Sequence, residues 1–166
     1  MLMIPLLIFV LLSCESWELM ALGAAILVHE CGHILALRFC GVPLSRFRFG
    51  MSGAVIDCLA LSSAWEEVLV ALAGSLFGLL WALALSFLPI PYAPYAAEVS
   101  AVLSVFNLLP VPLLDGGRIF CALGGSEKLL RVCGMLCILV LMHLCIRFRL
   151  WYSCPVLLWL GLECIV

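Results

Sequence analysis

The chain has 166 residues, of which 67% are hydrophobic and only 11% are charged, and its mean hydropathy is +1.32. A soluble domain is usually nearer half apolar and about a quarter charged, so this composition excludes an ordinary soluble protein and predicts an integral membrane protein. The formal net charge is -2 and the eight basic residues are scattered. We therefore expect a single membrane-embedded domain over residues 1–166, with the lipid bilayer as its surroundings and no nucleic acid as a partner.

The first part of the chain predicts two membrane segments. The first, from about Leu2 to Leu12, is short for a full span, and it lacks the basic flank and the cleavage pattern of a signal peptide. We expect it to be a retained membrane segment. The second runs from Trp17 to about Phe39, and a helix of that length spans roughly 30 Å, enough to cross the hydrocarbon core.

The character of the chain changes between Cys40 and Ala60. Arginine and phenylalanine alternate over residues 46–49, and Gly50 and Gly53 follow as turn signals. This period-two pattern predicts a short β-hairpin or a re-entrant loop. At membrane depth, such backbone is tolerated only where protein or water covers it.

Four further segments complete a predicted all-α polytopic fold of about six membrane segments. The third runs from about Trp65 to Leu88 and is followed by a proline-rich loop. The fourth begins near Ala96 and ends in a broken region over residues 107–118, where two prolines cannot continue an ordinary helix. The fifth spans about Leu129 to Ile146, and the sixth runs from about Leu150 to the C-terminus.

The basic residues predict an orientation in the bilayer. With the N-terminus in the cytoplasm, six of them fall on the cytoplasmic side: Arg38, Arg46, Arg48, Arg118, Lys128 and Arg131. Arg147 and Arg149 then fall outside, against the rule that cytoplasmic loops carry the excess of Lys and Arg. We therefore expect a site in the second half of the second segment to lie toward the cytoplasm.

The sequence His29-Glu30-Cys31-Gly32-His33 lies inside the second segment. In a helix, positions i and i+4 share one face, so both imidazoles can reach one metal ion. Zinc prefers such nitrogen donors and keeps an open position for water in catalytic sites. Glu30 is then the candidate general base that activates the water.

Two other interpretations of this motif stay open at this point. His29, Glu30 and His33 could form an inward-facing polar cluster that only joins helices. The chain could also be a metal-ion carrier or an inactive homologue, and a carrier would not need Glu30. Ionisable groups in hydrocarbon are expensive and usually functional, which favours the catalytic interpretation.

Two imidazoles need a third protein ligand to form a catalytic zinc site. Asp115 is the best candidate, because the broken end of the fourth segment falls on the same side of the membrane as the His pair. Gly116 and Gly117 would let its backbone approach another element closely. The alternative is an ordinary Asp-Gly-Gly turn at the membrane interface.

With these residues, the chain resembles the site-2 protease family of intramembrane zinc metalloproteases. The resemblance rests on the intramembrane His-Glu-x-x-His motif and on a later Asn-x-x-Pro-x-Pro-x-x-Asp-Gly-Gly-Arg motif that runs from Asn107 to Arg118. The small size and short first segment look most like the stage IV sporulation protein FB branch. The resemblance implies a protease of a bacterial cell membrane that cuts a membrane protein, with release of a transcription factor as one outcome.

The family likeness also implies roles for single residues. His29, His33 and Asp115 would bind zinc (Zn2+), and Glu30 would activate water. Asn107 would contact the substrate or its reacting carbonyl. The hairpin region, with Phe49 and Gly53, would pair with an unwound substrate strand, which agrees with strand addition as a binding mode.

The chain departs from the family pattern in the third segment. A Gly-Pro-x-x-Asn motif is common there, whereas this chain reads Gly74-Ser75-Leu76-Phe77-Gly78, without the proline and the asparagine. That puts local helix packing and substrate handling in doubt, but not the metal site. The chain also has no room for the PDZ or CBS domain of many relatives, so we expect regulation by those modules to be absent or to be supplied by a membrane partner.

Overall fold

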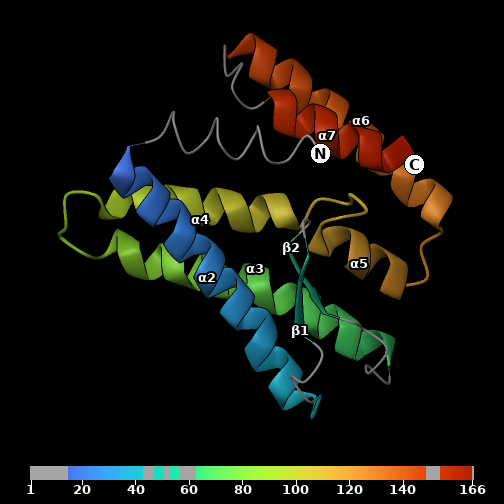
Figure 1. Cartoon of the computed structure of the whole chain (residues 1–166), viewed down its shortest axis with the longest axis horizontal. Helices are drawn as coiled ribbons and strands as arrows, with labels where there is room; N and C mark the ends of the chain where they lie inside the picture. The colour runs from blue at the N-terminus through green and yellow to red at the C-terminus, as the bar shows by residue number, and fades with distance from the viewer. Residues whose placement is uncertain (1–14, 43–46, 51–52, 57–62, 149–153, 166) are drawn as a thin grey trace.

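The structure, a computed structural model, describes residues 15–42, 47–50, 53–56, 63–148 and 154–165. These ranges contain six helices and two short strands, whose arrangement is shown in Figure 1. In chain order they are α2 (Ser16–Phe39), β1 (Phe47–Gly50), β2 (Gly53–Ile56), α3 (Ala64–Ser86), α4 (Ala93–Asn107), α5 (Asp115–Ala122), α6 (Glu127–Arg147) and α7 (Cys154–Ile165).

Helices α2, α3 and α4 pack against one another and form the first half of the fold. Small residues line the contact between α3 and α4: the Ser100 hydroxyl donates a hydrogen bond of 2.9 Å to the carbonyl oxygen of Gly78. A side chain at Gly78 would collide with Ser104, since a Cβ there would lie 2.1 Å from the Ser104 Oγ. Small residues of this kind let membrane helices approach closely, and their hydroxyls join the helices.

The contact between α2 and α3 is closer still. A Cβ atom built at Gly32 would lie only 2.6 Å from the carbonyl oxygen of Ala73, which is backbone and cannot rotate away. The two helices therefore touch backbone to backbone at this point. His33 follows Gly32 directly and is buried against α3, where its Nδ1 atom meets the carbonyl oxygen of Val70.

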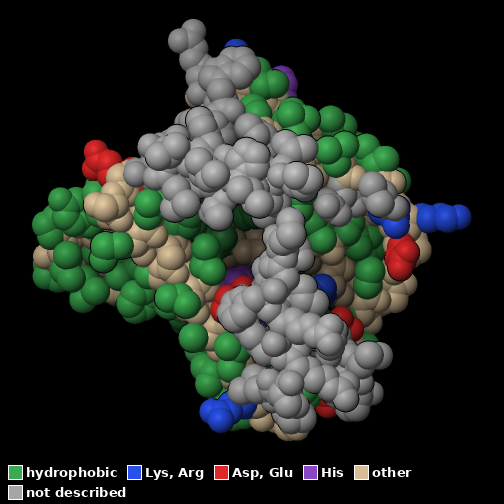
Figure 2. All heavy atoms as spheres, viewed as in Figure 1, with side chains coloured by type: hydrophobic (Ala, Val, Ile, Leu, Met, Phe, Trp, Pro, Cys, Tyr) green, Lys and Arg blue, Asp and Glu red, His purple; other side chains and the backbone are tan. Residues whose placement is uncertain are grey.

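Three of the described helices, α2, α3 and α6, are long and apolar enough to cross a membrane. Their outward faces are apolar: Leu27, Leu83 and Leu139 are each more than half exposed. In Figure 2 hydrophobic side chains cover most of the described surface, and Lys and Arg side chains lie chiefly toward its edges. This surface suits contact with lipid rather than water.

The prediction of about six membrane segments is met only in part by the described residues. Helices were predicted at α2, α3, α4, α6 and α7 and are present, but α4 has 15 residues and α7 has 12. Both are shorter than the roughly 20 residues that a straight span needs. The predicted first segment, Leu2 to Leu12, lies outside the described residues.

Two element boundaries differ from the sequence-based expectation. Helix α4 begins at Ala93, three residues before the expected start, because Pro94 stands in its first turn. Proline is well tolerated there, since the first-turn N–H groups have no partner within the helix. Helix α5 was not predicted as a separate element; it begins at Asp115, after the two prolines that end α4.

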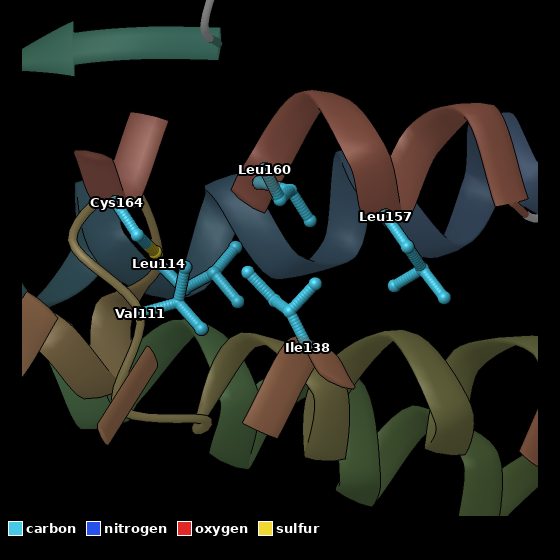
Figure 3. Packing of buried hydrophobic residues seen from close by; sticks show 6 residues of the cluster. All are labelled: Val111, Leu114, Ile138, Leu157, Leu160 and Cys164. Carbon is cyan, nitrogen blue, oxygen red and sulfur yellow. The ribbon is translucent and has the colours of Figure 1, made fainter. Parts of the chain in front are cut away.

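Helices α6 and α7 form the second half of the fold and are joined to the first through the loop between α4 and α5. Figure 3 shows this core, in which two loop residues meet side chains of α6 and α7. Its buried members are Val111, Leu114, Ile138, Leu157, Leu160 and Cys164. The loop before α5 is thus fixed by apolar packing on one side.

Strands β1 and β2 pair in antiparallel register, with Phe47 opposite Ile56 and Gly50 opposite Gly53. This pair occupies the region for which the sequence predicts a hairpin or a re-entrant loop. Residues 51–52, which join the two strands, lie outside the described residues.

Replacing Gly32 by Ala is expected to destabilise the fold by about 1–3 kcal/mol, because the new methyl group must push α3 away from α2. Thermal unfolding in detergent measures the change. Gly23→Ala on the same helix is the matched control, since nothing lies within 4 Å of a Cβ at that position. The control is expected to be neutral or to gain up to about 1 kcal/mol through helix propensity. Equal stability of the two variants would contradict the close contact.

Candidate metal centre

Three side chains from two distant parts of the chain meet at one point. The Nε2 atoms of His29 and His33 lie 3.1 Å apart, and the Oδ2 atom of Asp115 lies 3.0 Å from the first and 3.2 Å from the second. The exposed fractions of the three residues are 5%, 5% and 8%. Among the described residues, these three side chains form a group that could hold a metal ion.

The dimensions of this triangle fit a zinc site. Zinc binds nitrogen and oxygen at about 2.0–2.1 Å with tetrahedral geometry, so two of its ligand atoms should lie about 3.3 Å apart. The three measured edges are 3.0, 3.1 and 3.2 Å. Two imidazoles and one carboxylate also leave one tetrahedral position for water, as catalytic zinc sites do.

His33 is held in the orientation that a ligand needs. Its Nδ1 atom lies 2.8 Å from the carbonyl oxygen of Val70 on α3. A carbonyl oxygen can only accept, so Nδ1 carries the proton and donates it. The lone pair is therefore on Nε2, which faces Asp115 and His29. Such a backbone partner on the far nitrogen is typical of metal-binding histidines.

Gly74 provides the space for this imidazole. A Cβ at Gly74 would lie 2.3 Å from the His33 Nε2 atom and would occupy the place of the ring. In the sequence, Gly74 stands out only as part of a departure from the family motif, and this role was not predicted. The signal was present, because Gly74 and Gly78 are small residues four apart and so lie on one face of α3.

Asp115 is the first residue of α5, and the geometry of the preceding loop places it there. A Cβ at Gly116 would lie 2.1 Å from the carbonyl oxygen of Leu108, and one at Gly117 would lie 2.2 Å from that of Val111. Only glycine lets the helix start so close to the loop. The N-terminal end of a helix also favours a negative charge such as the Asp115 carboxylate.

The other residues singled out from the sequence take different places. Glu30 follows His29 on α2, is half-buried and is close enough for its charge to act on the His33 imidazole. The Asn107 side-chain amide donates a hydrogen bond of 3.0 Å to the carbonyl oxygen of Leu103, within its own helix. Phe49 and Gly53 lie on the paired strands, and their role in binding substrate stays a prediction.

The metal centre lies near the middle of a membrane-spanning helix. His29 is about 20 Å from the first residue of α2 and about 15 Å from the last, at 1.5 Å per residue. In Figure 2 histidine and acidic side chains are visible together near the middle of the molecule, away from its edges. A reaction at this centre would take place at the depth of the bilayer.

Part of the chain is similar to a known protein family, and its fold is similar to that of a solved structure. Residues 17–91 match the model of a protein family described as peptidase family M50. Among solved structures, the fold is similar to that of a site-2 protease from Methanocaldococcus jannaschii, with a TM-score of 0.69 and 20% sequence identity. That match covers 98% of this chain and 84% of the other. A search of curated proteins gives no match.

Removal of a ligand is expected to remove the metal. Purified wild-type protein should contain about one equivalent of zinc by elemental analysis, and His29→Ala and Asp115→Asn should contain little, because two ligands cannot complete the site. Retention of a full equivalent in both variants would exclude these residues from the site.

Gly74→Ala is expected to lower metal affinity although it changes no ligand, because its methyl group displaces the His33 ring. Competition between the protein and a zinc chelator measures the affinity. Gly23→Ala, which adds the same methyl group at an open position of α2, should bind as wild type does. Wild-type affinity of Gly74→Ala would show that the ring does not depend on this space.

Proposed function

We propose that this chain is a zinc-dependent metallopeptidase like those of peptidase family M50, whose model matches residues 17–91, and that it hydrolyses a peptide bond in or beside a membrane segment of a substrate protein. The observation that carries the proposal is the buried His29, His33 and Asp115 triangle, whose edges fit zinc. Two helices long and apolar enough to span a bilayer, α2 and α3, contribute to this triangle or contact it, which supports a substrate that is itself a membrane protein.

Zinc, when bound, would polarise a carbonyl group and make water acidic enough to act as a nucleophile near neutral pH. Glu30 supplies the proton transfer. Its carboxylate takes a proton from the attacking water and passes it to the nitrogen of the leaving amine, so that a carboxylic acid and an amine are formed. Its position next to His29, with its charge acting on His33, supports this role.

The substrate has to be extended before it can be cut. The carbonyl groups of a helix are occupied by intrahelical hydrogen bonds, so a substrate helix must unwind near the scissile bond. Antiparallel strands β1 and β2 offer an edge for an extended segment, with Phe49 and Gly53 among the residues in contact. Asn107, at the end of α4 and eight residues before Asp115, is a further contact for the substrate backbone.

The substrate and the setting belong to the proposal as well. The positive-inside rule favours a cytoplasmic orientation for the centre and so the release of a cytoplasmic product, such as a membrane-bound transcription factor. A place near the sporulation branch of the family, in a bacterial cell membrane, is part of the same proposal. A regulatory membrane partner would control access to the site.

Glu30→Gln is expected to abolish cleavage of a co-expressed membrane substrate while zinc remains bound, because the amide cannot accept the proton but the three ligands are unchanged. Cleavage is followed by immunoblot, and zinc by elemental analysis of the same preparation. Glu98→Gln on α4 is the matched control, since it removes an exposed carboxylate and should leave cleavage intact. Cleavage by the Glu30 variant at the wild-type rate would refute the proposed mechanism.

A further inference from the structure

One face of α3 supports the metal centre at two places. Val70 accepts the hydrogen bond from His33, and Gly74 gives space to the same ring. Glu67 lies three residues before Val70 and seven before Gly74, which places all three on one face of the helix. The Glu67 side chain is directed to Arg118 of α5: its Oε1 atom lies 3.9 Å from the Arg118 Nε.

Arg118 in turn faces the ligand Asp115. The Arg118 Nη1 atom lies 3.8 Å from the Asp115 Oδ1, and the two residues are three apart on α5. The two oxygens of the Asp115 carboxylate thus have different neighbours, because Oδ2 meets the imidazoles and Oδ1 faces the guanidinium. The structure thus places Arg118 between two carboxylates, those of Glu67 and Asp115.

We propose that Glu67 and Arg118 are positioning residues for the metal ligand Asp115, linking it to the same face of α3 that holds His33. This inference rests on the metal site of the proposed function. Partners that orient a metal ligand commonly contribute to metal affinity although they never touch the ion. The α3 helix would then set the relative orientation of ligands from α2 and α5.

The charges of the cluster support the same assignment. A guanidinium beside a divalent metal ion would be unfavourable alone, because like charges repel strongly where water is scarce. Glu67 compensates it. With Asp115, Glu30, Glu67, Arg118 and a divalent ion counted together, the cluster is neutral, and without Glu67 it would carry one excess positive charge. Glu67 and Arg118 remain about one third and one quarter exposed, so screening by water reduces but does not remove the effect.

The test measures metal affinity in the absence of substrate. Full-length protein is freed of metal in detergent and titrated with Co2+ alone, followed by the absorption spectrum of the bound ion. Glu67→Gln and Arg118→Gln are each expected to raise the Kd by roughly 10–100-fold and to alter the spectrum, because Asp115 is no longer held in place. Arg118→Lys, which keeps the positive charge, should recover part of the affinity.

Two matched controls separate positioning from a general loss of charge. Glu98→Gln on α4 and Arg131→Gln on α6 remove one exposed charge each and should bind Co2+ as wild type does. The double variant of Glu67 and Arg118 should lose no more affinity than the worse single variant, because both act through one carboxylate. Additive losses would overturn the linked role.

The inference fails if Glu67→Gln and Arg118→Gln bind Co2+ within twofold of wild type and with its spectrum. That result would leave the proposed protease function standing. Tight binding by wild type without cleavage of any substrate would instead refute the protease function and leave the positioning role intact. Circular dichroism and full Co2+ occupancy at saturation identify the variants that are folded. If Arg118→Gln does not fold, the Co2+ affinity of Arg118→Lys is measured in its place.

Discussion

The metal centre depends on the backbone contact between α2 and α3. Gly32 lets the two helices touch, and at this separation the His33 ring reaches both the Val70 carbonyl and the space over Gly74. A larger separation would leave the Nδ1 proton of His33 without its acceptor in a buried place, where an unsatisfied donor is costly. The packing of α2 against α3 therefore also sets the orientation of the ligand His33.

The protein reverses the usual distribution of polar groups, as a lipid environment requires. Large apolar side chains face outward, whereas Ser75, Ser100 and Ser104 are buried between helices. Lipid provides no hydrophobic drive for helices to associate, so small residues and interhelical hydrogen bonds hold them together. Gly74 on α3 leaves room for the His33 imidazole, which a larger side chain would exclude. A buried polar centre is thus compatible with an apolar exterior.

The loop between α4 and α5 connects the two halves of the fold to the centre. The Val111 and Leu114 side chains of this loop are part of the core with α6 and α7. Carbonyl groups of the same loop lie so close to Gly116 and Gly117 that a side chain at either position would collide with them. Asp115 lies at the point where these constraints meet. Because Leu114 directly precedes Asp115, packing of α6 and α7 against this loop helps to set the position of a metal ligand.

The sequence by itself determined the membrane class, the helices at α2, α3 and α6, the break before Asp115, and the pairing of His29 with His33, because these depend on composition, proline chemistry and local helix periodicity. It could suggest Asp115 as a ligand only by motif and side of the membrane. That Asp115 reaches the imidazoles, that Gly74 makes room for one of them and that Arg118 lies between two carboxylates were decided by the tertiary structure. These relations join residues from different helices, and their distances are set by helix packing, which local pattern does not encode.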